Sequence, residues 1–132
     1  IRFIGRIELF DSEMQKIIGD LEKMTKDYDS YRVNFAFAYG GRQEIVDAAQ
    51  KIANNSGEIS EKNISKNLYS NAPDPDLLLR TAEKRISNFM LWGSAYMELY
   101  FLDKYWPDVT LRDYIKALQD FDNRKRRFGK YE

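Results

Sequence analysis

The sequence predicts an α/β fold with a mostly parallel central sheet flanked by helices. Three observations predict it. Helical patterns alternate along the chain with short apolar runs, which is the order expected of parallel strands joined by crossover helices. The expected strands look apolar on both faces, as parallel strands must be. Hydrophobic residues make up 43% of the 132 positions, enough for one packed domain at most.

The first half of the chain predicts two strands separated by helices. Residues 1–4 are a short strand candidate, and residues 31–39 (YRVNFAFAY) are rich in aromatic and β-branched side chains, typical of a buried strand. Asp11 or Ser12 can cap the first helix, which should end near Asp27. Further helices are expected over residues 42–54 and 60–68, because their apolar residues recur at helical spacing or follow a capping serine.

The second half predicts two more strands and two more helices. A rigid turn rich in proline precedes a strand at Leu77–Leu79. Ser87 is expected to cap a helix that runs to about Ala95. A short strand is expected from Glu98 to Phe101. Thr110 should cap the last helix. Its apolar side chains are expected to face inward: Leu111, Tyr114, Ile115, Leu118 and Phe121.

Composition excludes several classes of function. Lys and Arg number 21 and so do Asp and Glu, so the neutral chain has no electrostatic footprint for nucleic acid. It contains no cysteine and no histidine, which excludes thiolate nucleophiles and any triad built on imidazole. No apolar stretch reaches the roughly 18 residues of a membrane span and no signal peptide is visible, so a cytoplasmic protein is expected.

The stretch 76–98 (DLLLRTAEKRISNFMLWGSAYME) carries the clearest candidate site. Arg80 ends an apolar strand, and Arg85 and Ser87 follow closely. Guanidinium groups match phosphate oxygens bidentately, and the capping Ser87 would add an anion site at a helix N-terminus. Glu98 lies 11 residues after Ser87, close to three helical turns, and a carboxylate beside a phosphate suggests a bridging divalent cation. The alternatives are two surface arginines with an ordinary N-cap, and a surface glutamate.

Two weaker candidates lie elsewhere. Gly40-Gly41-Arg42 follows a predicted strand and could approach a ligand, or could be an ordinary strand-to-helix turn. The tail from Arg124 to Lys130 has five basic residues. Such a tail is usually solvated, but it could reach a phosphate site on its own chain or on a neighbour.

Three segments together resemble one known family. DLLLRTAEKRISNFMLWGSAYMELYFLDKYWPD resembles the C-terminal signature of the cis-prenyltransferases, the undecaprenyl diphosphate synthase family. NFAFAYGGRQEIVDA resembles the strand-Gly-Gly-Arg-helix segment of that family, and Arg127-Phe128-Gly129 its C-terminal Arg-x-Gly ending. The resemblance runs from Ile1 to Gly129 in the same order and spacing.

The resemblance implies a function and roles for particular residues. The family condenses isopentenyl diphosphate with an allylic prenyl diphosphate to give polyprenyl diphosphate. Arg80, Arg85 and Ser87 would hold the isopentenyl diphosphate with the backbone near Ile86, and Glu98 would help bind Mg²⁺ across a homodimer interface. Arg127 and Gly129 would approach the diphosphate from the partner subunit. Peripheral membrane association at product release is compatible with such a protein.

The chain departs from the family pattern in two ways. The family's N-terminal half, with its Asp-Gly-Asn-x-x-Arg-Trp loop, is absent from residues 1–132, which are therefore expected to be the C-terminal portion of a single domain and inactive alone. The loop from Arg80 to Arg85 is one residue shorter than usual. The alternative is a non-catalytic partner subunit of a cis-prenyltransferase complex. Such a subunit would have no need of the four candidate site residues Arg80, Arg85, Ser87 and Glu98. A generic nucleotide module is disfavoured, because no G-x-x-x-x-G-K-[ST] loop is present.

Overall fold

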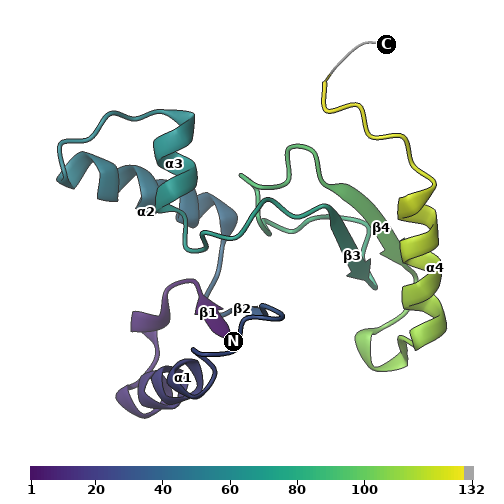
Figure 1. Ribbon diagram of the computed structural model, residues 1–132, viewed down its shortest axis with the longest axis horizontal. Coiled ribbons are helices and arrows are strands. Elements are labelled where there is room, and N and C mark those ends of the chain that lie inside the picture. The colour runs from purple at the N-terminus through teal and green to yellow at the C-terminus, as the bar shows by residue number, and fades with distance from the viewer. Residues whose placement is uncertain (130–132) are drawn as a thin grey trace. The chain divides into compact units, whose positions relative to one another are not determined.

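The structure, a computed structural model, describes residues 1–129. The chain divides into two compact units, Ile1–Ala72 and Pro73–Glu132, and each is described by itself. Figure 1 labels the elements of both units. No helix within residues 1–129 has the length and apolar content needed to cross a membrane.

The first unit contains one parallel strand pair and three α-helices. In chain order its elements are β1 (Arg2–Ile4), a 3-10 turn (Ile7–Leu9), α1 (Ser12–Met24), β2 (Asn34–Ala36), α2 (Gly41–Asn54) and α3 (Glu61–Asn67). Phe3 of β1 lies opposite Phe35 of β2, and α1 connects the two strands. The Asp11 carboxylate caps α1 by accepting a hydrogen bond of 2.8 Å from the Met14 amide, as the sequence predicts.

The strand predicted over residues 31–39 is shorter and more exposed than expected. Only Asn34–Ala36 pairs as β2, and all three of its residues are exposed. Among the described residues of this unit, β1 is the only strand beside β2, so no second neighbour covers it. Instead of packing against a further strand, the aromatic rings of Phe3, Phe35 and Phe37 pack on one another, with centroids 5.1 to 6.4 Å apart.

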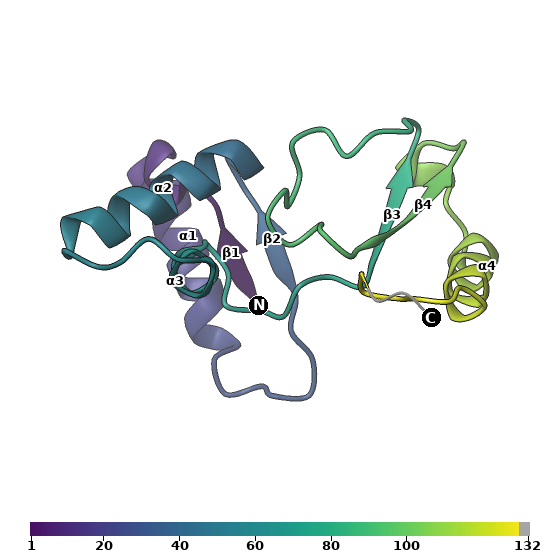
Figure 2. The ribbon, with the colours of Figure 1, turned by 90° about the horizontal axis from the view of Figure 1, so that it is seen from above.

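The second unit contains another parallel strand pair and one α-helix. Its elements are β3 (Leu77–Thr81), β4 (Glu98–Leu102), a 3-10 turn (Trp106–Asp108) and α4 (Leu111–Asp122). Figure 2 shows β3 and β4 side by side, with α4 next to β4. Thr110 and Asp113 form a reciprocal capping box at the start of α4. The α/β class and the parallel pairing are thus as the sequence predicts.

The helix predicted to begin at Ser87 is absent from the structure. Residues 87–95 form a series of turns rather than a helix, because Ser87, Asn88 and Met90 have φ angles of +49°, +62° and +47°. A right-handed helix cannot contain such residues. Ser87 therefore caps no helix, and the anion site expected at a helix N-terminus there is absent.

The apolar face of α4 is also more open than predicted. Four of the five residues expected to face inward are exposed by 41% to 74%, namely Leu111, Tyr114, Ile115 and Leu118. The buried residue of this helix is Ala117, which is fully covered. Helical periodicity thus identified an apolar face correctly, but not whether another element of the described chain covers it.

Candidate functional site

Two arginines share one carboxylate at the carboxyl end of β3. Arg80 is the fourth residue of β3, and Arg85 lies four residues beyond the end of the strand. Glu83 lies between them in the loop. Its Oε2 accepts a hydrogen bond of 2.7 Å from Arg80 Nη2, and its Oε1 accepts one of 2.7 Å from Arg85 Nη2. A further bond of 3.0 Å joins Arg85 Nε to Glu83 Oε2.

The loop is held in place by the end of β4. The Ala82 amide lies 3.0 Å from the Leu102 carbonyl oxygen and 2.9 Å from that of Lys104. Ala82 has a φ of +63°, a left-handed conformation that turns the chain sharply after the strand. The Glu83 amide then donates to the Thr81 carbonyl oxygen at 2.7 Å. The tight turn directs the Glu83 side chain between the two guanidinium groups.

The electrostatics of this cluster favour an anion. Hydrogen bonds from Arg85 and then from Arg80 hold the pKa of the Glu83 carboxyl below its usual value. The same contact with Glu83 raises the pKa of Arg85. Two guanidinium groups face one carboxylate, so one positive charge is left uncompensated inside the cluster. A diphosphate offers more oxygens and more charge than Glu83, so this geometry is suited to binding one.

The residues after Arg85 lie in an accessible turn. Ser87 is exposed and Ile86 is partly buried. The Ile86 carbonyl oxygen accepts a hydrogen bond of 3.0 Å from the Phe89 amide, which closes the turn. The structure therefore brings Arg80 and Arg85 together through Glu83, and leaves Ser87 accessible beside Arg85 in the chain.

Glu98 lies at the other end of the strand pair. It is the first residue of β4 and is paired with Leu77, whereas Arg80 is paired with Phe101. Three residues of strand separate these two levels, which is about 10 Å. Because strand side chains alternate, Glu98 and Arg80 also point to opposite faces. The prediction that Glu98 shares a helix face with Ser87 is wrong.

Glu98 is bound to an arginine that follows α4. Arg124 Nη1 lies 2.8 Å from Glu98 Oε2 and 3.1 Å from the Leu99 carbonyl oxygen, and Arg124 Nη2 lies 2.6 Å from Asp120 Oδ2. These acids, Glu98 first, raise the pKa of Arg124. Residues 1–129 contain no group of three acidic side chains placed to hold a metal ion. Glu98, the carboxylate predicted to bind Mg²⁺, thus fits the ion only if other oxygen ligands share it.

The C-terminal tail lies at this same amino end. Arg126 Nη1 is 2.5 Å from Asp76 Oδ1, and Asp76 immediately precedes β3. Arg127 is exposed, and Gly129 has a φ of +74° close to the Tyr96 ring. Sequence reasoning grouped these arginines as a basic tail and missed their partners. The basic run was a signal, but it gave no indication of which acids it meets.

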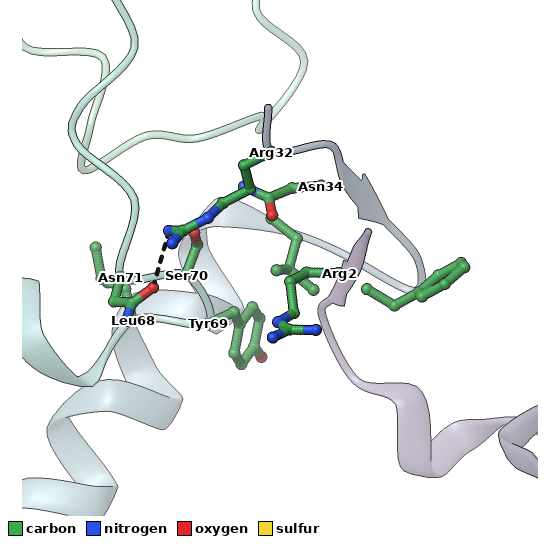
Figure 3. A pocket seen from close by; sticks show the side chains of 9 residues that line it. Arg2, Arg32, Asn34, Leu68, Tyr69, Ser70 and Asn71 are labelled. Atoms are coloured by element: carbon green, nitrogen blue, oxygen red, sulfur yellow. Dashed lines mark hydrogen bonds between the residues drawn. The ribbon is translucent and has the colours of Figure 1, made fainter. Parts of the chain in front are cut away.

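The first unit contains a polar hollow of about 310 Å³ at the amino ends of β1 and β2 (Figure 3). Arg2 and Arg32 project into it, and Arg32 donates to Asn71 Oδ1 at 3.4 Å. In open parallel sheets ligands bind at the carboxyl ends of the strands. This hollow lies at the amino ends of the strands of the first unit, and none of the predicted site residues lines it.

The Gly40-Gly41-Arg42 segment belongs to a structural network in the first unit. Gly41 and Arg42 form the first turn of α2. Glu44, in the same first turn, is 5% exposed and accepts hydrogen bonds from the Tyr39 hydroxyl and, at 3.1 Å, from the Tyr69 amide. The Tyr69 hydroxyl in turn donates to Asp47, which lowers the pKa of that carboxyl. These bonds tie α2 to the segment after α3.

The curated proteins similar to this chain are named as prenyl-chain synthases or transferases. A synthase from Methanocaldococcus jannaschii, named tritrans,polycis-undecaprenyl-diphosphate synthase (geranylgeranyl-diphosphate specific), is 47% identical over 98% of this chain and 50% of its own length. An isoprenyl transferase of Aquifex pyrophilus is 46% identical over 98% of this chain and 58% of its own. The chain spans about half the length of the curated relatives it matches.

Two solved structures share the fold. A probable undecaprenyl diphosphate synthase from Campylobacter jejuni has a TM-score of 0.91 and 38% identity over 98% of this chain and 62% of its own. Lavandulyl diphosphate synthase from Lavandula x intermedia, solved with dimethylallyl diphosphate, has the same TM-score and 34% identity over 98% of this chain and 59% of its own. The family described as putative undecaprenyl diphosphate synthase matches residues 1–129, and this chain belongs to that prenyltransferase family.

Proposed function

We propose that this chain provides the isopentenyl diphosphate half-site of an enzyme that elongates cis-prenyl chains. The reaction condenses isopentenyl diphosphate with an allylic diphosphate to give polyprenyl diphosphate. The observation that carries the proposal is the pair of guanidinium groups, Arg80 and Arg85, held on one anion at the carboxyl end of β3. Family membership supplies the reaction class.

Arg80 and Arg85 would bind the diphosphate in place of Glu83. Both guanidinium groups already direct Nη2 atoms at carboxylate oxygens, and phosphate oxygens require the same geometry. Arg85 is 67% exposed and Arg80 30%, so a ligand from solvent can reach the pair. The Ser87 hydroxyl and the backbone near Ile86 would add hydrogen bonds, because Ser87 is exposed next to this cluster in the chain.

The chemistry needs no side-chain nucleophile. The allylic C–O bond breaks and diphosphate leaves with the electron pair. The alkene of isopentenyl diphosphate then attacks the allylic carbon, and loss of a proton restores a double bond. The absence of cysteine and histidine is compatible with this route. An allylic diphosphate as the second substrate is supported by the lavandulyl diphosphate synthase, which was solved with dimethylallyl diphosphate.

The geometry supports a site shared between two copies of the chain. Glu98 and Arg80 point to opposite faces at opposite ends of one strand pair, so one ligand cannot meet both within a single second unit. In a homodimer, Glu98 of one copy would help hold Mg²⁺ near the diphosphate bound by the other. When bound, Mg²⁺ neutralises diphosphate charge. Arg127 and Gly129 would approach that diphosphate from the same partner, because the tail lies at the Glu98 end.

The proposed domain organisation makes residues 1–132 the C-terminal portion of a single domain of this family. On that basis this chain alone binds isopentenyl diphosphate but does not elongate an allylic primer. The supporting observation is coverage: the chain matches 50% to 59% of the length of its curated relatives.

The test measures binding and turnover separately. Titration calorimetry of the 132-residue chain with isopentenyl diphosphate and Mg²⁺ should give saturable binding that the Arg80→Ala variant loses. The longest reading frame containing residues 1–132 should incorporate labelled isopentenyl diphosphate into a polyprenyl product from an allylic primer. Failure of that reading frame to form product would refute the reaction, and binding unaffected by Arg80→Ala would refute the site.

A further inference from the structure

The side chain of Arg126 in the C-terminal tail makes several close contacts. Its Nη1 lies 2.5 Å from Asp76 Oδ1, and its Nη2 lies 3.4 Å from the Tyr96 carbonyl oxygen. The guanidinium carbon lies 4.5 Å from the centroid of the Phe128 ring and 5.4 Å from that of Phe121. The side chain is only 21% exposed, although it follows the last helix by four residues.

These contacts join three separate segments of the second unit. Phe121 belongs to the last turn of α4, and Asp76 immediately precedes β3. Tyr96 lies two residues before the start of β4. The Tyr96 ring also packs on the Phe128 ring, with centroids 5.8 Å apart. Arg126 therefore fixes where the tail leaves α4 and where it meets the amino end of the strand pair.

The residues that follow Arg126 depend on this anchor. Phe128 and Gly129 have φ angles of +46° and +74°, so the chain turns directly after it. Arg127 lies between the anchored Arg126 and this turn, and its side chain is exposed. Its backbone is held on both sides, by Arg126 before it and by the Phe128 ring after it, while its guanidinium group remains accessible.

We infer that Arg126 is a positioning residue, which holds the tail so that Arg127 and Gly129 are presented to a diphosphate. Asp76 is its principal counter-residue. The inference rests on the proposed function, because it assumes that the tail contacts isopentenyl diphosphate. It adds that the position of the tail depends on the Arg126–Asp76 ion pair and on the rings of Phe121 and Phe128.

A purely structural role would leave a different signature. Asp76 is 71% exposed, and an ion pair with so exposed a partner adds little to global stability. Loss of Arg126 should therefore leave the melting temperature of the chain nearly unchanged. What it should change is the order of the tail and the affinity for the ligand, because a loosened group is presented less often in the productive position.

The test compares four variants of the 132-residue chain. Arg126→Gln removes the charge, Asp76→Asn removes its partner, and Asp76→Glu keeps the ion pair. Lys125→Gln is the matched control, since Lys125 is the exposed cation next to Arg126. Nuclear magnetic resonance follows the fast motion of the Phe128 and Gly129 amides, and calorimetry follows the dissociation constant for isopentenyl diphosphate with Mg²⁺.

Arg126→Gln and Asp76→Asn should both mobilise the two amides and weaken isopentenyl diphosphate binding about tenfold, as loss of supporting contacts around a site does. Asp76→Glu and Lys125→Gln should match the wild-type chain in both measurements. Tail amides or an affinity unchanged in Arg126→Gln would overturn the inference and leave the proposed function standing. Absence of ligand binding by the wild-type chain would overturn the proposed function, and the inference with it.

Discussion

The two ends of the β3–β4 pair carry different arrangements of charge. At the carboxyl end, two arginines meet one acid, because Arg80 and Arg85 share Glu83. At the amino end one arginine meets two acids, because Arg124 lies between Glu98 and Asp120. The carboxyl end therefore carries surplus positive charge suited to a diphosphate. At the amino end the acids are matched by arginines, since Arg126 pairs with a third acid, Asp76, and Glu98 already has Arg124 as its partner.

The difference matters for the proposed site, which would take its arginines from one end and Glu98 from the other. The strand pair separates the two charge arrangements by about 10 Å and directs them to opposite faces. In the proposed homodimer, two chains would bring unlike ends together at one substrate.

The largest effect is expected from removing an arginine at the carboxyl end. Arg80→Ala or Arg85→Ala should weaken isopentenyl diphosphate binding about 10- to 100-fold, because each loses charge-assisted hydrogen bonds. Calorimetry of the 132-residue chain measures the dissociation constant. Arg112→Ala, which removes an exposed arginine of α4, is the control and should bind as the wild-type chain does. Equal losses in all three variants would mean that bulk charge, and not this pair, binds the ligand.

The sequence predicted the strands that carry Arg80 and Glu98 better than the contacts that these residues make. The strand beginning at Leu77 and the one beginning at Glu98 were expected and are present. Local signals suffice for such elements, since an apolar run and its flanking turn lie within a few residues of each other. The same holds for α1 and α4, whose capping residues Asp11 and Thr110 act as predicted.

Local signals failed where the backbone or a distant partner decides. Ser87 followed by an apolar segment is typical of a capped helix, yet positive φ angles at Ser87 and Asn88 break it. The partners of Glu98 and Asp76 could not be predicted either, because Arg124 and Arg126 lie 26 and 50 residues away along the chain. Pairings at such separations depend on how the elements pack, which no short pattern encodes.

At the amino end, Glu98→Gln should raise the Mg²⁺ concentration needed for half-maximal isopentenyl diphosphate binding about tenfold. The reason is that glutamine keeps the size of the side chain but removes the charge that would hold the ion. Asp120→Asn is the matched control, since Asp120 also pairs with Arg124 and has no proposed metal role. A Mg²⁺ requirement that shifts equally in both variants would show that Arg124, rather than a metal ligand, explains the effect.

A smaller effect is expected from Gly93, which lies against the segment that leads into β3. A Cβ atom at Gly93 would come within 3.1 Å of both Asp74 Oδ1 and Pro75 Cδ. Gly93→Ala should therefore lower the free energy of unfolding by about 1 kcal/mol, as mild overpacking does. Urea denaturation measures it. Gly19→Ala in α1, where no atom lies within 4 Å of the added Cβ, should instead stabilise the chain.

The smallest effect concerns the charge of Glu83 at the carboxyl end. Its folded pKa is depressed by Arg85 and Arg80, so the ion pairs present at neutral pH should persist as the pH falls through 4.5, the ordinary value for this group. They should be lost only as the pH falls through the lower folded value. Carbon-13 resonances of the Glu83 carboxyl report this midpoint. In Arg85→Ala it should move up toward 4.5, because the hydrogen bonds from Arg85, which lower this pKa most, are gone. A midpoint that is the same in both chains would mean that Arg85 does not hold this carboxylate in solution, and the two-arginine cluster would then be reduced to Arg80.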